Sequence, residues 1–241
     1  MRGIVLAGGT GTRLYPCTEV TNKHLLPVYD KPMIFHPLET LRNMGIKDIM
    51  IVTGGECMHD FLRLLGSGSK MDINFTYRIQ DDALGIAHAL LLAEDFAKAG
   101  NENEKIAVIL GDNIFEDVAL PKEEQENDNA IIFIKEVDEP ERFGVVEFDN
   151  KNNAIKIEEK PKTPKSKHVV TGLYLYPNDV FDVIKKLKIS SRGEYEITDV
   201  NNYYIEQGRM KVVKLDGFWS DAGTFDSLHK ATSFIKKKRY S

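Results

Sequence analysis

Short apolar runs alternate with helical patterns through the first half of the chain. Each apolar run is bounded by glycine or polar residues, and each helical pattern repeats apolar residues every three or four positions. The expected strands are residues 3–7, 48–53, 73–79 and 106–110. The expected helices are residues 32–44, 56–65 and 85–98. Strands that alternate with helices predict a mostly parallel sheet with helices on both faces.

In the second half, strands follow one another closely. The four expected strands are residues 130–136, 144–148, 155–159 and 169–176, and some of their connections have hairpin length. After them we expect helices at 178–186 and 196–207, a strand at 211–215 and a last helix from about Thr224. The predicted fold class is therefore α/β: a Rossmann-like, mostly parallel mixed sheet flanked by helices, with an antiparallel strand region.

Size and charge narrow the possibilities. A chain of 241 residues with 42% hydrophobic content can bury one substantial core, and no stretch resembles a linker, so we expect a single domain over 1–241. The formal net charge of −5 predicts neither nucleic acid nor membrane as a partner. The N-terminus passes directly into a candidate strand and no apolar run approaches the roughly 20 residues of a membrane span, so we expect a cytoplasmic protein.

A glycine-rich stretch, Leu6 to Leu14, follows the first expected strand directly. Glycines there let backbone N–H groups approach a phosphate, and Arg13 adds a positive charge. A P-loop is excluded because no lysine stands at the required position, and a dinucleotide fingerprint because Leu14 replaces its third glycine. A plain turn is an equal alternative for the glycines alone. Lys23 shortly afterwards favours a site for a triphosphate.

These residues belong to a longer series of motifs that resembles the sugar nucleotidyltransferase family, most closely its glucose-1-phosphate thymidylyltransferases. The first half of the series is Gly8-Gly9-x-Gly11-Thr12-Arg13-Leu14, Lys23-x-Leu25-Leu26-Pro27-Val28, Lys31-Pro32-Met33, Gln80 with Gly85, and Leu110-Gly111-Asp112-Asn113. The second half is Pro140 to Val145, Glu158-Glu159-Lys160-Pro161, Thr171-Gly172-Leu173-Tyr174, Arg192 to Asn201 and Trp219 to Thr224. The motifs run in family order from end to end.

The resemblance implies a role for each motif. It implies a nucleotide site at Leu6, Gly8, Gly9, Gly11, Thr12, Arg13, Lys23, Gln80, Gly85 and Asp112, of which Arg13, Lys23 and Asp112 are implied to be catalytic. It implies a sugar-phosphate site, in the antiparallel region and beside it, at Gly144, Glu159, Lys160, Val170, Gly172, Arg192 and Trp219. The cofactor it implies is Mg²⁺, held by Asp112 and Asp221.

Simple chemistry is compatible with these roles without requiring them. Magnesium takes one or two carboxylates together with phosphate oxygens and water, although a lone aspartate after a strand, as at Asp112, can also cap a turn. The amide of Gln80 could both donate to and accept from the edge of thymine or uracil, although an ordinary surface glutamine is the simpler interpretation. The six histidines form no pair with metal-ligand spacing, so we expect them to be structural or surface residues.

The implied activity is transfer of a nucleotidyl group from dTTP to glucose-1-phosphate, giving dTDP-glucose and pyrophosphate by Mg²⁺-assisted in-line attack. A uridylyltransferase that uses UTP remains an alternative, because thymine and uracil differ by one methyl group. A nucleotide-sugar glycosyltransferase would normally show Asp-x-Asp, where this chain has Gly111-Asp112-Asn113. A non-catalytic sensor would not need Arg13 and Lys23 together with the two aspartates.

Longer thymidylyltransferases continue for tens of residues beyond the helix that follows Thr224, and that extension helps to form a regulatory nucleotide site. Only residues 225–241 follow here, so the resemblance is to a short form that lacks the C-terminal extension. It therefore gives no expectation of feedback control at that site. We expect a homo-oligomer, such as a dimer.

Overall fold

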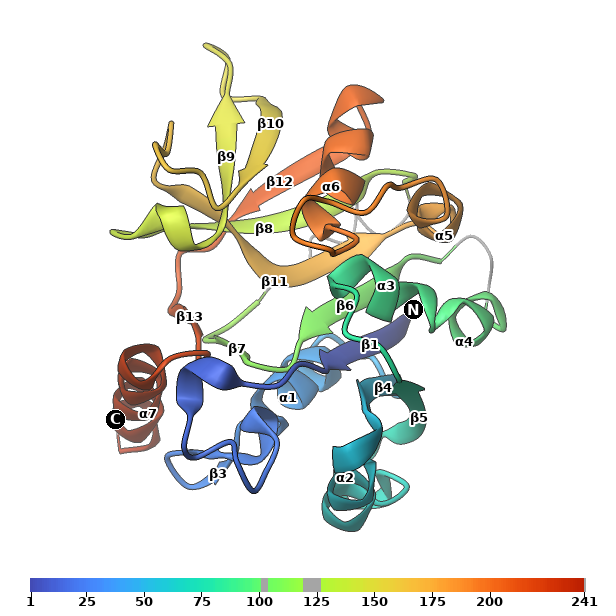
Figure 1. Ribbon diagram of the computed structural model, residues 1–241, viewed down its shortest axis with the longest axis vertical. Helices are drawn as coiled ribbons and strands as arrows, with labels where there is room; N and C mark the ends of the chain where they lie inside the picture. The colour runs from blue at the N-terminus through green and yellow to red at the C-terminus, as the bar shows by residue number, and fades with distance from the viewer. Residues whose placement is uncertain (101–103, 119–126, 241) are drawn as a thin grey trace. The chain divides into compact units, whose positions relative to one another are not determined.

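The computed structural model describes residues 1–100, 104–118 and 127–240. The chain forms two compact units. The N-terminal unit comprises Arg2–Ala83, Ile109–Ala119 and Gly217–Ser241, and the central unit comprises Met1, Leu84–Val108 and Leu120–Asp216. In Figure 1 the N-terminal unit is drawn in blue, cyan and dark red, with β7 in green. That the chain forms a single domain remains a prediction.

Parallel strands form the centre of the N-terminal unit. Strand β4 (Asp48–Gly54) lies between β1 (Arg2–Ala7) and β5 (Asn74–Gln80), and both pairings are parallel. Ala7 pairs with Thr53, and Gly54 with Gln80, so the carboxyl ends of all three strands meet at one edge. The apolar residues of β1 and β4 are buried, as their apolar runs predict, whereas Arg2 and Asp48 at the strand starts are not. Ligands of open α/β sheets bind at such an edge.

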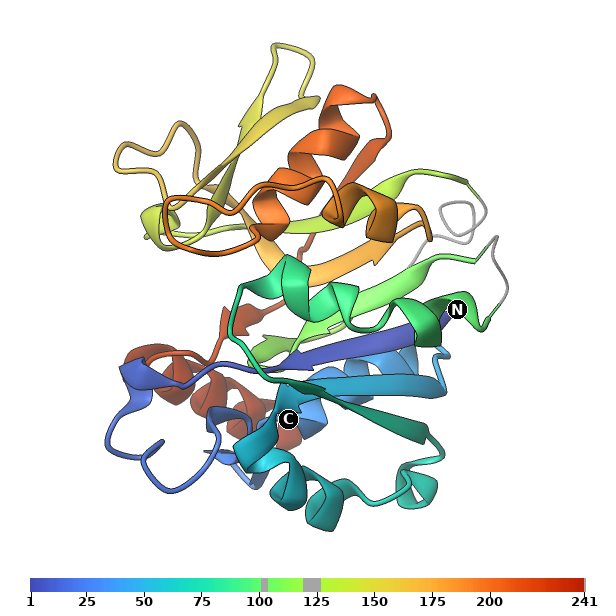
Figure 2. The same ribbon diagram turned by 45° about the vertical axis from the view of Figure 1, so that its right-hand side comes forward.

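The helices of this unit follow the predicted pattern with shifted boundaries. Helix α1 (Phe35–Asn43) begins later than expected because residues 31–32 form a small hairpin: strand β2 (Pro27–Val28) pairs with β3 (Lys31–Pro32). Helix α2 (Met58–Leu65) follows a 3₁₀ turn, Gly55–Cys57. Helix α7 (Phe225–Arg239) begins at a capping box of Thr224 and Ser227 and packs against β2. Figure 2 shows the same arrangement from a second direction.

A two-stranded ribbon, which the sequence pattern did not predict, completes the N-terminal unit. Strand β7 (Asn113–Phe115) pairs antiparallel with β13 (Trp219–Asp221). Strands of three residues are too short to show hydrophobic alternation, which explains why the prediction missed them. A small core of Val28, Met33, Ile114, Ala222 and Ala231 joins the ribbon to α7 and the hairpin.

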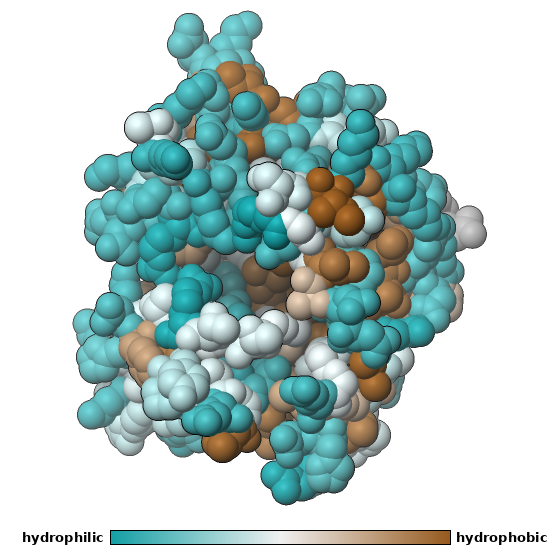
Figure 3. Space-filling model, viewed as in Figure 1, coloured by the Kyte–Doolittle hydropathy of each residue, from teal (hydrophilic) through white to brown (hydrophobic). Residues whose placement is uncertain are grey.

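The central unit contains the antiparallel strands. Strand β11 (His168–Tyr176) lies between β8 (Ala130–Glu136) and β9 (Gly144–Phe148), and β9 forms a hairpin with β10 (Ala154–Glu159). Strand β12 (Met210–Lys214) adds to β8 in parallel. The 3₁₀ turn Pro140–Arg142 precedes β9. Hydrophilic residues cover most of the visible face of the β9–β10 region (Figure 3).

One helix of the central unit was predicted wrongly. Residues 85–98 form two helices, α3 (Ile86–Leu91) and α4 (Glu94–Lys98), because the Ala93 N–H donates to Leu90, three residues earlier, instead of continuing the α-helical pattern. Helix α5 is shorter than expected, Val180–Ile184, whereas α6 (Ile197–Glu206) matches within one residue. Strand β6 (Ile106–Leu110) contains the boundary between the units.

The predicted fold class is confirmed: a mixed α/β fold in which helices flank a sheet that contains both parallel and antiparallel strands. None of the helices formed by the described residues has the length and apolar character needed to cross a membrane.

Candidate functional site

The glycine-rich loop leaves the carboxyl end of β1 and is held in place by side chains. The Ala7 carbonyl accepts hydrogen bonds from the Thr53 hydroxyl (3.1 Å) and from Asn22 Nδ2 (3.4 Å). Gly9 and Gly11 have φ of 94° and 64°, a region that favours glycine. Thr12 and Arg13 then begin a short 3₁₀ turn. The glycines are therefore required by the backbone, and the loop leaves Arg13 exposed.

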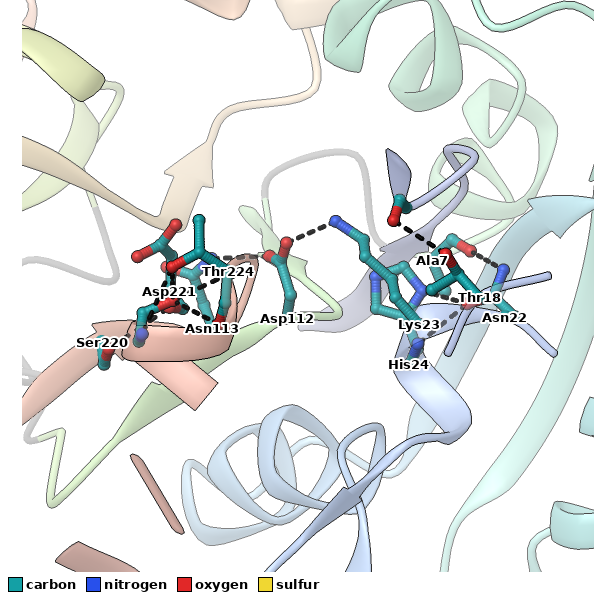
Figure 4. Close-up of polar contacts among 12 residues, drawn as sticks. Ala7, Thr18, Asn22, Lys23, His24, Asp112, Asn113, Ser220, Asp221 and Thr224 are labelled. Atoms are coloured by element: carbon teal, nitrogen blue, oxygen red, sulfur yellow. Dashed lines mark hydrogen bonds and ion pairs between the residues drawn. The ribbon is translucent and has the colours of Figure 1, made fainter. Parts of the chain in front are cut away.

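Asp112 lies beside this loop. The predicted site residue Leu6 is buried in β1, and its carbonyl accepts from the Gly111 N–H at 2.9 Å, which fixes the turn that carries Asp112. Lys23 reaches Asp112 from a second 3₁₀ turn, with 2.5 Å between Nζ and Oδ2. Figure 4 shows the lysine side chain directed at the carboxylate. The structure therefore brings together three of the residues expected to act on the nucleotide.

Electrostatics keep Asp112 ionised. Burial alone would raise the pKa of its carboxyl, but the Lys23 ammonium and the hydrogen bonds from Lys23 and Asn113 together hold that pKa well below its ordinary value. The Asn113 amide donates to the second carboxylate oxygen, Oδ1, at 2.9 Å. Both oxygens of Asp112 thus have a donor.

The ribbon brings Asp221 to the same place. Asp221 pairs with Asn113 in the β7–β13 register, and the Ala222 N–H donates to the Asp112 carbonyl at 2.7 Å. At Gly223, an added Cβ would lie 3.1 Å from Arg13 Nη2, 3.3 Å from Asp221 Oδ2 and 3.5 Å from Asp112 Oδ2. The two carboxylate oxygens are thus at most 6.8 Å apart, the sum of the last two distances. The structure brings Arg13, Asp112 and Asp221 around one glycine.

Two residues that were not predicted to belong to the site, Asn22 and His24, support the turn that carries Asp112. The Asn22 side-chain oxygen accepts from the His24 backbone N–H at 2.9 Å and lies 2.6 Å from the ring Nδ1. The His24 ring packs against Gly111, where an added Cβ would lie 2.7 Å from Cδ2. Burial, with the nearby Lys23 charge, lowers the pKa of His24 to about 3, so the ring is neutral at pH 7. His24 is a structural residue, as expected, but one that positions Asp112.

Gln80 ends β5 at the same edge as the loop. Its side-chain oxygen lies 2.8 Å from the position that a Cβ on Gly8 would occupy. Because Gly8 has no side chain, the amide can lie directly against the loop. The structure therefore places the residue expected to recognise the base next to the residues expected to hold the phosphates.

The central unit holds a second cluster around Glu159. The Thr198 hydroxyl donates to Glu159 Oε2 at 2.7 Å, and Arg192 Nη1 lies 3.4 Å from Oε1. Gly144 lies beside this carboxylate, since a Cβ there would be 3.4 Å from Oε2. Lys160 has a φ of 45°, which is unfavourable for a residue other than glycine, and its Nζ lies 3.7 Å from Glu159 Oε1. A strained conformation of this kind is typical of functional positions.

Arg192 contacts more than one carboxylate. Its guanidinium lies 3.3 Å from Glu194 and 3.3 Å from Glu196, in addition to Glu159. Burial raises the pKa of Glu196, although hydrogen bonding from Ser190 and the charge of Arg192 oppose that effect. Four of the predicted sugar-phosphate residues, Gly144, Glu159, Lys160 and Arg192, therefore lie in one cluster of the central unit.

Gly85 packs against the backbone of another segment of the central unit. A Cβ on Gly85 would lie 2.7 Å from the carbonyl oxygen of Tyr195, and its φ is 97°. Around it the Tyr195 N–H donates to Leu84, and the Ala87 N–H to Tyr195. The glycine thus allows close packing against the segment that follows Arg192. That Gly85 belongs to the nucleotide site remains a prediction.

The remaining predicted residues are buried strand residues. Val170 and Gly172 lie in β11. Trp219 lies in β13 of the N-terminal unit, with its ring N–H donating to Asn113 at 2.7 Å. Trp219 therefore belongs structurally to the group around Asp112 rather than to the central-unit cluster.

The site offers two carboxylates to a metal ion. Within residues 1–100, 104–118 and 127–240, no group of three or more His, Cys, Asp or Glu side chains could hold a metal. Asp112 and Asp221 nevertheless fit Mg²⁺, which takes one or two carboxylates and completes its coordination with phosphate oxygens and water. Asn22, Asn113 and Thr198 escaped the prediction because their roles depend on contacts that sequence spacing does not reveal.

The sequence profile of the nucleotidyl transferase family matches residues 2–238. A glucose-1-phosphate thymidylyltransferase of Neisseria meningitidis is 48% identical over 98% of this chain and 83% of its own length. Its counterpart from Mycobacterium tuberculosis is 47% identical, over 98% and 82%.

Solved structures give the same result. A Bacillus anthracis protein assigned as a glucose-1-phosphate thymidylyltransferase, solved with sucrose, is 51% identical, with a TM-score of 0.91 over 98% of this chain and 95% of that chain. A UDP-glucose pyrophosphorylase in complex with UDP-glucose is 26% identical, with a TM-score of 0.84 over 98% of both chains. The family resemblance of the motifs is thereby confirmed, and the chain belongs to the nucleotidyl transferase family, among the glucose-1-phosphate thymidylyltransferases.

Proposed function

We propose that the chain transfers a thymidylyl group from dTTP to glucose-1-phosphate, giving dTDP-glucose and pyrophosphate. The observation that carries the proposal is the meeting of the glycine-rich loop, Lys23, Asp112 and Asp221 at the carboxyl edge of one parallel sheet. The choice of dTTP and glucose-1-phosphate as substrates is inferred from the sequence identity to glucose-1-phosphate thymidylyltransferases.

In this reaction a phosphate oxygen of glucose-1-phosphate attacks the α-phosphorus of dTTP. The new P–O bond forms as the bond to the β-phosphate oxygen breaks, and pyrophosphate leaves with the electron pair. The attacking oxygen is already ionised at neutral pH, so the step needs no general base. Positioning and charge neutralisation are what the protein must supply.

The residues of the N-terminal unit suit the triphosphate. Backbone N–H groups of Gly8 to Thr12 would bind its oxygens, and Arg13 would stabilise the charge that develops on pyrophosphate. Lys23 would bridge the phosphates. Mg²⁺, held by Asp112 and Asp221, would supply Lewis-acid polarisation of the α-phosphate.

The cluster of the central unit suits the second substrate. Lys160 and Arg192 would bind the phosphate of glucose-1-phosphate and offset its repulsion from the triphosphate. Glu159, oriented by Thr198, would accept hydrogen bonds from sugar hydroxyls. Gln80 would recognise the edge of the base beside the loop.

A uridylyltransferase is the second candidate. It is favoured by the similarity to UDP-glucose pyrophosphorylase and by the ability of a glutamine to recognise uracil as well as thymine. The methyl group that separates the two bases is worth roughly 1 kcal/mol in a pocket.

A pyrophosphate-release assay tests both candidates. Purified protein is given dTTP, UTP, GTP or CTP with several sugar-1-phosphates and Mg²⁺. We expect the highest kcat/KM with dTTP and glucose-1-phosphate. A higher value with UTP would establish the second candidate, and no release with any pair would contradict both.

A further inference from the structure

The ion pair between Lys23 and Asp112 occupies the carboxylate that is proposed to hold the metal. The ammonium lies 2.5 Å from Oδ2, and the two side chains are 16% and 11% exposed. Asn113 donates to Oδ1. Each oxygen of the Asp112 carboxylate therefore has a donor within the protein.

A metal ion cannot simply join this arrangement. An ammonium group has three donors and no acceptor, so it cannot coordinate a cation. A Mg²⁺ at its usual 2.0–2.1 Å from Asp112 would lie close to the Lys23 charge, and like charges repel strongly where water is largely excluded. The Lys23 charge therefore opposes binding of the metal to Asp112 as long as the ammonium stays on Oδ2.

The Lys23 side chain leaves the backbone beside the glycine-rich loop. Its Cβ lies 3.2 Å from the position that a Cβ on Gly11 would occupy, so the stem of the lysine runs alongside the glycine-rich loop. The loop is the part of the site proposed to bind the triphosphate. A bound triphosphate would thus offer the ammonium several anionic oxygens within the reach of one side chain.

We propose that Lys23 is a latch that withholds Asp112 from Mg²⁺ until a nucleoside triphosphate binds and draws the ammonium to its phosphates. The latch rests on the proposed function, because it takes the loop as the triphosphate site. It makes the nucleotide-free enzyme a poor metal binder, because a metal ion without nucleotide must compete with the Lys23 ammonium for Asp112.

The test measures metal binding without nucleotide, because a triphosphate chelates metal ions by itself. Mn²⁺ replaces Mg²⁺ as the probe, and the signal of free Mn²⁺ is followed by electron paramagnetic resonance. The variants are Lys23→Met, which removes the charge, Lys23→Arg, which keeps it, and Lys23→Met combined with Asp112→Asn. Lys31→Met is the matched control, because Lys31 pairs with Glu39 away from Asp112.

We expect Lys23→Met to bind Mn²⁺ at least about tenfold more tightly than the wild type. Removal of the ammonium leaves the negative charge of Asp112 buried without a partner, and a bound cation would stabilise that charge. Lys23→Arg and Lys31→Met should retain weak binding, and adding Asp112→Asn should abolish the gain. Equal or weaker binding by Lys23→Met would overturn the latch, as would a gain that survives Asp112→Asn. If Lys23→Met does not fold, as judged by circular dichroism, Lys23→Gln takes its place.

Failure of the latch and failure of the proposed function give different results. If the wild type releases pyrophosphate but Lys23→Met gains no metal affinity, only the latch is wrong. If the wild type releases none with any nucleotide, the proposed function is wrong, whatever the metal titration shows.

Discussion

The two charged clusters of this protein differ in burial and in charge balance. In the N-terminal unit, Lys23 and Asp112 form a buried pair of one cation and one anion. In the central unit, Arg192 and Lys160 are 38% and 46% exposed and share the carboxylates of Glu159, Glu194 and Glu196. Buried ion pairs are costly to break, whereas exposed ones contribute little.

This difference indicates how each cluster could respond to its substrate. In the N-terminal cluster, the charge of Lys23 is balanced by that of Asp112. A bound triphosphate must therefore replace Asp112 as the anionic partner of Lys23. The central cluster has more anions than cations, so an incoming phosphate must compete for two cations that water already reaches. We therefore expect substitutions in the first cluster to have large effects and those in the second to have modest ones.

The largest effect is expected from Asp112→Asn. The amide keeps the shape but cannot provide the charge that a metal and Lys23 require, so kcat/KM should fall at least about 1,000-fold. Pyrophosphate release at saturating Mg²⁺ measures it. Asp117→Asn is the control, because Asp117 is an exposed carboxylate of the same unit and should leave the rate unchanged. Near-normal turnover of Asp112→Asn would remove this residue from the chemistry.

The next effect concerns the pH dependence of stability. The folded state holds the pKa of His24 near 3, against 6.5 for the exposed side chain. Below pH 6.5 the unfolded chain therefore binds a proton that the folded chain does not, and the free energy of unfolding falls as pH decreases, by up to about 1.4 kcal/mol per pH unit.

Urea unfolding of the wild type and His24→Gln, at pH 7 and pH 4, measures this contribution. Between pH 7 and pH 4, the free energy of unfolding should fall by about 3 kcal/mol less in the variant than in the wild type. His36→Gln is a useful comparison, because burial lowers the pKa of His36 to about 4 and its contribution lies in the same window. Identical losses for His24→Gln and the wild type would show that the ring is not held neutral.

A smaller effect is expected from Gly8→Ala. The added Cβ would lie 2.8 Å from the Gln80 side-chain oxygen, the end of a flexible side chain, so the amide should move while the fold remains. We expect the ratio of kcat/KM for dTTP to kcat/KM for GTP to fall about tenfold, which is the effect expected when one hydrogen-bonding group no longer contacts the base. Gly54→Ala is the matched control, since nothing lies within 4 Å of its Cβ position. An unchanged preference would mean that Gln80 does not read the base.

The smallest effect is expected from Arg192→Gln in the exposed cluster. The KM for glucose-1-phosphate should rise up to about fivefold, with kcat little changed, because exposed charge pairs are worth at most about 1 kcal/mol. Arg142→Gln, which removes an exposed arginine paired with Glu139, serves as the control. A loss as large as that of Asp112→Asn would show that the two clusters do not differ as proposed.

The parts of the fold that depend on local sequence could be predicted. Strand β1 and the glycine-rich loop follow from an apolar run and from backbone requirements at Gly9 and Gly11. The start of α7 follows from Thr224 and its capping box. The break between α3 and α4 could not be predicted, because the pattern of apolar residues continues through it.

For the candidate site, the sequence motifs named residues but not the contacts that bring them together. The motifs named Asp112 and Asp221, but only the β7–β13 ribbon shows how they meet. Neither the pairing of Lys23 with Asp112 nor the support from Asn22 and His24 follows from spacing, because these contacts join separate segments. The split of the predicted residues between two units was also not apparent from the sequence.

The ribbon has a consequence for the order in which the enzyme becomes active. Asp221 pairs with Asn113, which lies far from it in the sequence. The carboxylates of Asp112 and Asp221 therefore cannot come together until residue 221 has been synthesised. Contacts between such distant segments also carry a large entropy cost of loop closure. A nascent or truncated chain would carry the glycine-rich loop and Lys23 without Asp221. Under the proposed function, such a chain would lack one of the two carboxylates for Mg²⁺, so nucleotide turnover would report that the β7–β13 ribbon has formed.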